Sequence, residues 1–226
     1  MIKFTPIILA LLLACPLVFA EAKGGGAEVS VGYQFSEVEA VTKTAEAMGL
    51  DMDLSKTNEL MLDIHGWSVV NRFIRLGGII SGGYFDAKGE PSADVMNEDE
   101  SGVGFGDARI AFLPEFHADF GPINAGAGVA LGGGTIIPFI NDDNGDNDGD
   151  MFFYGFMRPQ ITAAYDLGPL GVQVGSGYHL PLAGSDGEFW FLNSASDTIR
   201  HEFEAADMGG FFIKLGVFFG NLGVED

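Results

Sequence analysis

Eight stretches of this sequence alternate between a continuous apolar face and a face of polar residues and glycines. This period of two constrains the fold more than any other feature. In one stretch, Val29, Val31 and Tyr33 alternate with Ser30 and Gly32. Successive side chains of a β-strand point to opposite faces, so the pattern predicts strands with two unlike faces. The predicted strands cover about 28–35, 59–65, 73–84, 107–118, 123–132, 157–165, 170–180 and 210–219.

The connections between these strands alternate in length. The long, acidic ones cover about 36–58, 85–104, 137–150 and 183–207, and the short ones are "WSVVN" (67–71), "DFGPI" (119–123) and "DLGPL" (166–170). Long outer loops and short periplasmic turns are typical of outer-membrane barrels. The pattern therefore predicts an all-β fold, an eight-stranded antiparallel up-and-down transmembrane β-barrel, with the repeated Gly-Pro turns as two of its three periplasmic hairpins.

The first twenty residues, MIKFTPIILALLLACPLVFA, have the pattern of a secretory signal. A lysine precedes an apolar run, and Ala20 is a small residue of the kind that precedes a signal-peptide cleavage site. The run itself is too short to span a bilayer as a helix. We therefore expect a signal peptide over 1–20 and a single barrel domain over 21–226. "LLAC" also resembles a lipoprotein box, in which Cys15, the only cysteine, would be lipidated.

Alternation alone does not distinguish a transmembrane barrel from a soluble one. A soluble lipocalin-like barrel has the same alternation but turns its apolar face inward around a ligand. Ten tilted residues rise about 23 Å, which matches the apolar band of an outer-membrane barrel. Aromatic residues also lie near the expected strand ends: Phe116 and Tyr165 by the short turns, Phe35 and Tyr84 by the long loops, and Trp67 at a turn. Two such girdles at opposite levels favour an apolar face in contact with lipid.

The polar face would then line a lumen that is only wide enough for side chains. Charges removed from water need partners, so a nearly balanced set predicts a network of ion pairs. Inward glycines over 126–134 leave room for long neighbours such as Arg109 and Arg158, or else form a small cavity. The predicted lumen network comprises Glu28, Glu59, Asp63, His65, Arg75, Asp107, Arg109, Glu115, His117, Arg158, His179 and Lys214.

With a signal peptide, eight strands, three short turns and four long loops, the sequence resembles the small outer-membrane barrels of the OmpA, OmpX and OmpW kind. The resemblance rests on architecture over nearly the whole chain after residue 20. It implies a structural, adhesive or small-solute role, with outer-membrane lipids and the barrel-insertion machinery as partners. Members usually end on an aromatic residue that this machinery recognises. Here the chain continues past Phe219 with "GNLGVED".

The long loops hold 22 of the 32 acidic residues and four basic ones, so the outer mouth is expected to attract divalent cations. The net charge of −21 also argues against a nucleic-acid partner. Within 141–150, the spacing of acids resembles the opening of a calcium loop, although the closing Glu is missing, and Asn-Asp-Gly runs also favour plain turns. The candidate calcium ligands are Asn144, Asp146, Asp148 and Asp150.

Motifs for catalysis are missing from the sequence. Gly-x-Ser-x-Gly does not occur, and "GVGFG" (102–106) enters a strand rather than a helix, which argues against a phosphate cradle. The resemblance allows a lipid-modifying enzyme as an alternative, but the deacylase-like His-x-Ser motif is missing. We therefore expect a non-catalytic protein without a cofactor, calcium apart. The apolar segment 188–192 in the last loop could contact lipid, the mouth or a partner.

Overall fold

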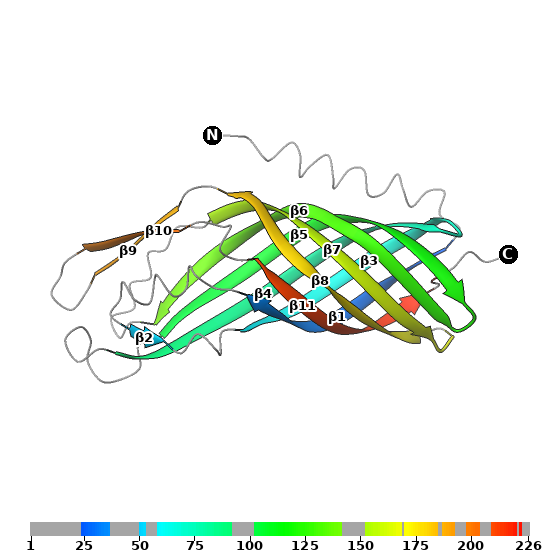
Figure 1. Ribbon diagram of the computed structural model, residues 1–226, viewed down its shortest axis with the longest axis horizontal. Coiled ribbons are helices and arrows are strands. Elements are labelled where there is room, and N and C mark those ends of the chain that lie inside the picture. Colours follow the sequence, from blue (N-terminus) through cyan, green and yellow to red (C-terminus); the bar gives the residue numbers. More distant parts are fainter. Residues whose placement is uncertain are drawn as a thin grey trace.

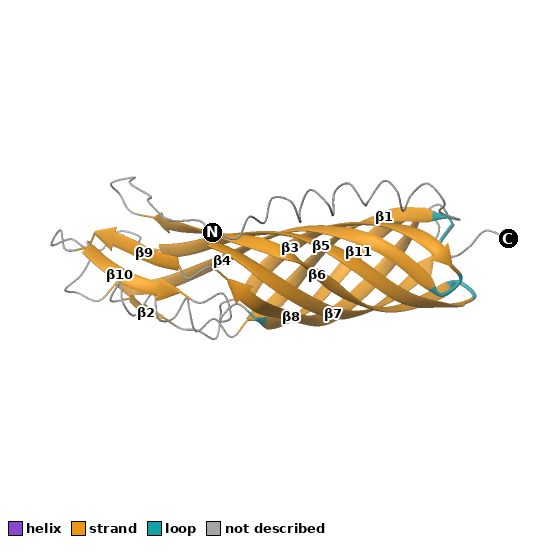
Figure 2. Cartoon of the chain, turned by 90° about the horizontal axis from the view of Figure 1, so that it is seen from above, coloured by secondary structure: helices purple, strands orange, loops and turns teal. Residues whose placement is uncertain are grey.

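The computed structural model describes residues 24–36, 50–52, 58–91, 102–141, 152–168, 170–184, 187–192, 198–203, 209–220 and 222. Eight strands form one closed antiparallel barrel, which Figures 1 and 2 show from the side. They are β1 (Gly25–Ser36), β3 (Asn58–Asn71), β4 (Ile74–Pro91), β5 (Gly102–Phe120), β6 (Ile123–Asn141), β7 (Phe152–Asp166), β8 (Leu170–Gly184) and β11 (Gly210–Gly220). Each pairs with the next, and β11 pairs with β1 along its length, which confirms the predicted eight-stranded barrel.

Three further strands lie at one end of the barrel, which we call the loop end (Figure 1). β2 (Leu50–Met52) pairs with the last residues of β4, and β9 (Gly187–Leu192) pairs with β10 (Thr198–Phe203). These strands fall inside two connections that were expected to be loops. None of the described residues forms a helix long and apolar enough to cross a membrane.

The barrel strands have 11 to 19 residues and are longer than the ten or so expected. β4 and β5 account for much of the difference, because they stay paired as far as Lys88 and Gly102, well into the predicted loop 85–104. Backbone pairing needs no apolar face, so strands continue beyond the level at which alternation ends. Alternation therefore marks only the part of each strand that has unlike faces.

The opposite end carries the three short connections, and we call it the turn end. The two Gly-Pro hairpins lie where predicted, between β5 and β6 and between β7 and β8. Gly121 and Gly168 have φ angles of 69° and 104°, in the region that side chains disfavour. In the second hairpin the Gly168 amide donates to Asp166 Oδ1 over 2.7 Å. Both hairpins thus use glycine for a backbone conformation that few other residues adopt.

The third turn does not lie at 67–71, so that prediction is wrong. β3 runs through this segment to Asn71, and the chain reverses at Arg72 and Phe73, where the Phe73 amide donates to Asn71 Oδ1 over 2.8 Å. The β3–β4 register shifts between Val69 and Asn71. Such an irregularity breaks the period of two, which makes a strand resemble a turn in the sequence. Trp67 therefore lies on a strand, points inward and is 2% exposed, so it is not part of an aromatic girdle.

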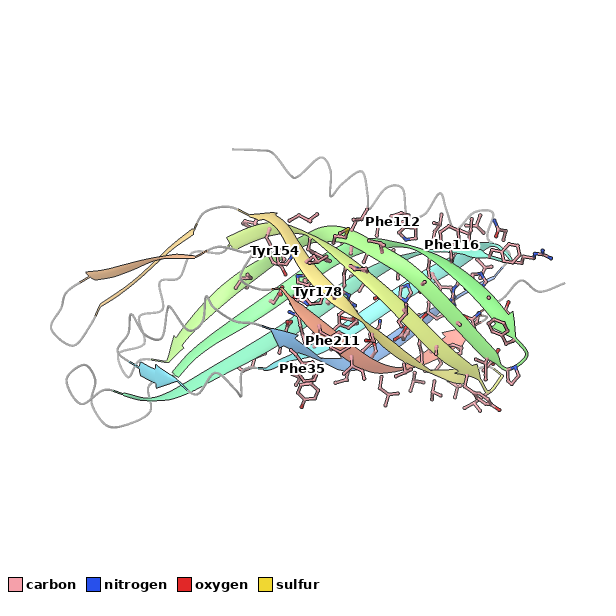
Figure 3. All side chains as sticks on the ribbon, viewed as in Figure 1. Phe35, Phe112, Phe116, Tyr154, Tyr178 and Phe211 are labelled. Atoms are coloured by element: carbon pink, nitrogen blue, oxygen red, sulfur yellow. The ribbon has the colours of Figure 1, made fainter. Side chains whose placement is uncertain are left out.

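Large apolar side chains cover the outside of the barrel. Phe116 is 70% exposed, and Phe35 and Tyr84 are each about half exposed. Figure 3 shows Phe35 and Phe116 projecting away from the strands. Glu28, Arg75 and Arg109, charged residues of the same three strands, are buried inside. A lipocalin-like barrel requires the reverse arrangement, so the transmembrane alternative is the one that the fold supports.

Candidate functional site

The lumen gathers the buried charged groups of the barrel strands and is the candidate site. All twelve residues of the predicted network point into it, and none is more than 5% exposed. They come from seven of the eight barrel strands, and β6 contributes mainly glycines and small residues to the lumen. The twelve are Glu28, Glu59, Asp63, His65, Arg75, Asp107, Arg109, Glu115, His117, Arg158, His179 and Lys214.

Arg109 holds together the cluster nearest the loop end. Its Nη2 donates to both carboxylate oxygens of Glu59, over 2.7 and 2.8 Å, and its Nε donates to Asp107 Oδ2 over 2.6 Å. The Tyr154 hydroxyl donates to the same Asp107 oxygen over 2.9 Å. Arg109 thus contacts two buried carboxylates from two strands. Planar, charge-assisted contacts of this kind are among the strongest polar interactions in proteins.

Arg158 and Lys214 occupy the middle of the lumen. Arg158 Nη2 donates to Asp63 Oδ2, and its guanidinium lies 4.5 Å from the ring centroid of Phe212. Lys214 Nζ lies 3.5 Å from the same Asp63 oxygen and 3.6 Å from Glu28 Oε1. Two cations therefore share one carboxylate, and the lysine links it to a second.

Glu28 connects this middle cluster to the next level toward the turn end. Its Oε2 accepts a hydrogen bond from Gln173 Nε2 over 2.6 Å and lies 3.7 Å from His65 Nδ1. The His65 ring in turn lies 5.2 Å from the ring of Trp67. Glu28 thus contacts side chains from three other strands, β3, β8 and β11, which follow one another with β1 around the barrel.

Arg75 forms the cluster nearest the turn end. Its Nη2 donates to Glu115 Oε1 and, over 2.9 Å, to Asn124 Oδ1. The Asn124 amide nitrogen lies 3.4 Å from His117 Nδ1, and His117 Nε2 lies 3.3 Å from the Asn71 carbonyl oxygen. This chain of contacts runs from the lumen to the turn between β3 and β4.

His179 packs against two aromatic rings of β7. Its ring centroid lies 4.7 Å from that of Phe156 and 5.9 Å from that of Tyr154. Neither ring nitrogen has a hydrogen-bond partner among the described residues. The predicted network therefore separates into three charged clusters, with His179 as a packed aromatic neighbour.

The buried charges of the lumen nearly balance, with five carboxylates and four cations, and every cation contacts at least one carboxylate. In such an arrangement the buried charged groups serve as ion-pair partners for one another. In the part of the chain that the structure describes, no three His, Cys, Asp or Glu side chains are grouped to hold a metal ion. The candidate calcium ligands Asn144, Asp146, Asp148 and Asp150 lie outside the described residues, as do Cys15 and the segment 1–20. β9 covers 188–192, but its side chains are also outside that part.

Glycines on β6 leave space that neighbouring side chains fill. A Cβ at Gly134 would lie 2.7 Å from the Tyr154 ring, and one at Gly126 would lie 2.6 Å from Glu115 Oε1. The side chains nearest these two positions are thus Tyr154 at Gly134, and Thr162 and Glu115 at Gly126, whereas Arg109 and Arg158 were the expected neighbours. Lys214 has a similar arrangement, since a Cβ at Gly175 would lie 2.9 Å from its Cε. Small residues on one strand make room for bulky polar groups on another.

Several neutral partners in the network were not predicted from the sequence. Tyr154 could have been found by extending the alternation of 157–165 toward the loop end, because it shares a face with Arg158. Gln173 lies on the same alternating face of 170–180 as His179 but carries no charge. Asn124 lies at the start of β6, beside a turn, where a polar residue has an ordinary explanation. The predicted lumen network was chosen by charge. Side-chain amides and phenols form hydrogen bonds but carry no charge, so these residues were left out.

No known protein family matches the sequence, and no curated protein matches it. Among solved structures, neisserial surface protein A has a TM-score of 0.50 at 10% identity, with 88% of this chain and 97% of that chain covered. Ail, the attachment invasion locus protein of Yersinia pestis, was solved with the heparin analogue sucrose octasulfate. It has a TM-score of 0.44 at 15% identity and covers 87% of this chain and 99% of its own.

A major outer membrane protein from Thermus thermophilus has a TM-score of 0.44 at 10% identity, with 87% of this chain and 99% of that chain covered. Identities this low concern the fold alone. The closed antiparallel sheet, its apolar outside and the match to neisserial surface protein A agree on that fold. The chain is an eight-stranded barrel of the kind that small bacterial outer-membrane proteins form.

Proposed function

We propose that the protein is a non-catalytic barrel of the bacterial outer membrane that holds its long loops at the outer surface and conducts no solutes. The observation that carries this proposal is the filled lumen, in which four buried cations and five buried carboxylates contact one another. An eight-stranded barrel has room for side chains and little else. The role is therefore structural rather than porin-like.

Single-channel recording in planar bilayers tests this role. We expect the refolded wild-type protein to give no stable current steps, because the ion pairs fill the lumen. Heat-modifiable migration on unboiled gels, run on the same preparation, shows that the barrel is folded. A lack of current steps from such a preparation then means that the lumen is closed. Large and stable steps would reveal an open pore and would favour a porin.

The acidic loops support a second part of the proposal, which concerns partners. They carry 22 acids and four bases, so they are expected to draw cations to the outer mouth. Besides divalent cations, the partners are outer-membrane lipids around the apolar face and the insertion machinery that assembles such barrels. No cofactor is required for this role.

Calorimetry separates two ways in which the loops could bind cations. Diffuse attraction depends on ionic strength, makes no distinction between calcium and magnesium, and fades in salt. A coordination site prefers calcium, because flexible carboxylate and carbonyl ligands suit the larger ion. We expect the diffuse effect to dominate at about 0.15 M ionic strength, since 141–150 lacks the closing Glu. Saturable micromolar calcium binding that is lost on Asp146→Ala with Asp148→Ala would contradict this expectation.

A further inference from the structure

The chain turns sharply where β11 ends at the turn end. Gly220 has a φ angle of 107°, a conformation that side chains disfavour. A Cβ at this position would also lie 2.7 Å from the Cα of Gly26, at the start of β1. Only glycine suits a segment that passes this close to the neighbouring strand. The sequence continues for six more residues after this turn.

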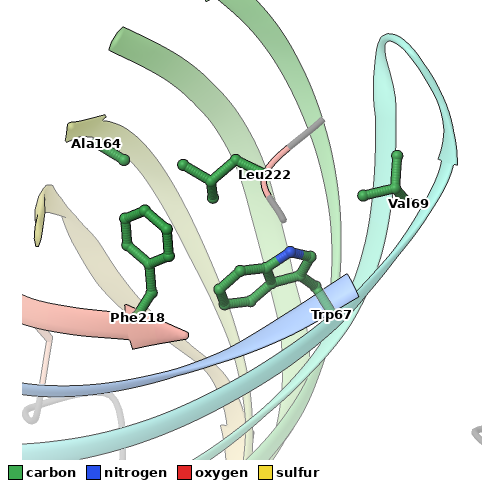
Figure 4. Close-up of a cluster of buried hydrophobic side chains, with 5 residues drawn as sticks. All are labelled: Trp67, Val69, Ala164, Phe218 and Leu222. Carbon is green, nitrogen blue, oxygen red and sulfur yellow. The ribbon is translucent and has the colours of Figure 1, made fainter. Parts of the chain in front are cut away.

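Leu222, two residues beyond the turn, is buried with 3% of its surface exposed. It belongs to an apolar cluster with Trp67, Val69, Ala164 and Phe218 (Figure 4). These four come from β3, β7 and β11, each within a few residues of the turn end of its strand. Leu222 therefore joins walls of the barrel that do not pair with one another.

The cluster borders the polar network of the lumen. The Trp67 ring lies 6.2 Å from that of Phe218 and 5.2 Å from that of His65, and the Arg75 guanidinium lies 5.9 Å from the Trp67 ring centroid. On β3 Trp67 therefore lies between His65 and the turn end, and on β11 Phe218 lies between Lys214 and the turn end. A constriction lined by such side chains excludes water and ions.

From this geometry we propose that Leu222, two residues after β11, completes an apolar seal that closes the turn end of the barrel. The seal keeps water from the periplasmic side away from Glu28, His65 and Lys214. This assignment rests on the closed lumen proposed above and adds a second, separable barrier. It also explains why the chain runs on beyond Phe219, the last outward aromatic residue of β11.

A thiol placed inside the seal reports whether it is closed. Ala164 is 5% exposed and belongs to the cluster, so Ala164→Cys puts a small reactive group inside the cluster that Leu222 completes. Cys15 is the only native cysteine, and Cys15→Ser leaves the reporter as the sole thiol. The labelling rate with a charged maleimide is then measured on refolded protein in detergent micelles.

We expect Leu222→Asp in this background to raise the labelling rate at least about tenfold, because the opened seal exposes the thiol without unfolding the barrel. Leu167→Asp is the matched control: the same change at a turn-end leucine that is 63% exposed should leave the rate unaltered. Leu222→Ala should give an intermediate rate. Heat-modifiable migration identifies the variants that keep the barrel.

The outcomes distinguish this inference from the proposed function. Slow labelling in every variant, with a barrel that stays folded, would show that Leu222 seals nothing, even if the wild type conducts no current. Fast labelling with Leu222 intact would equally overturn the seal. Current steps from the wild type would instead contradict the closed lumen, whatever the labelling rates are.

Discussion

Replacing Arg109 with methionine is expected to lower the free energy of unfolding by about 3–5 kcal/mol, because it leaves buried carboxylates without their cation. Arg109 donates three hydrogen bonds to Glu59 and Asp107, and all three residues are at most 5% exposed. Methionine preserves much of the side-chain volume, so the lost stability reflects the missing charge more than a packing defect. Urea titration of the refolded protein in lipid vesicles measures the change.

Neutralising the partners provides the control for this prediction. Glu59→Gln and Asp107→Asn, introduced together with Arg109→Met, should recover most of the lost stability, since no uncompensated charge then stays buried. A cost below about 1 kcal/mol for Arg109→Met alone, the range of exposed ion pairs, would mean that solvent reaches the cluster. A triple variant as unstable as the single one would assign the effect to packing.

The faces of the strands could be predicted from the sequence because each barrel residue meets one of two very different environments. Val29, Val31 and Tyr33 are about half exposed on the outside, whereas Glu28 and Ser30 are buried in the lumen. The alternation of β1 and β11 therefore shows directly which residues face the lumen and which face outward. Strand number and the order of long and short connections follow from the same pattern.

The pattern fails where the backbone is irregular. Near the end of β3, Trp67, Ser68 and Val69 are all buried, and Val70 and Asn71 are both exposed. A register shift changes which face each residue occupies, so no fixed period describes this segment. The position of Leu222 could not be predicted either. It lies two residues after the turn at Gly220, and so short a stretch has no alternating pattern.

The partners within the lumen could not be derived from the sequence either. Arg109 lies 50 residues from Glu59 and 45 from Tyr154, and these contacts depend on the stagger of strands around the barrel. Arg158 on β7 also reaches across the lumen to Asp63 on β3, which is not an adjacent strand. Alternation therefore identifies which charged residues are inside and leaves their pairing undetermined.

The central claim is that the apolar face meets lipid and the charged face lines a closed interior. Leu215, in the middle of β11, tests it most directly, since it is 66% exposed and lies between Val31 and Val174 on the outside. Arginine at the centre of the apolar band costs about 2–4 kcal/mol, whereas near the membrane interface it costs about 0–1 kcal/mol. Leu170, at the turn end of β8 and 42% exposed, provides the matched interface position.

The deciding measurement is a urea titration in lipid vesicles of the wild type, Leu215→Arg and Leu170→Arg. We predict that Leu215→Arg is less stable than the wild type by about 2–4 kcal/mol and that Leu170→Arg differs from it by at most about 1 kcal/mol. Equal stability of all three proteins would place Leu215 in water, and the transmembrane barrel described above would then be contradicted.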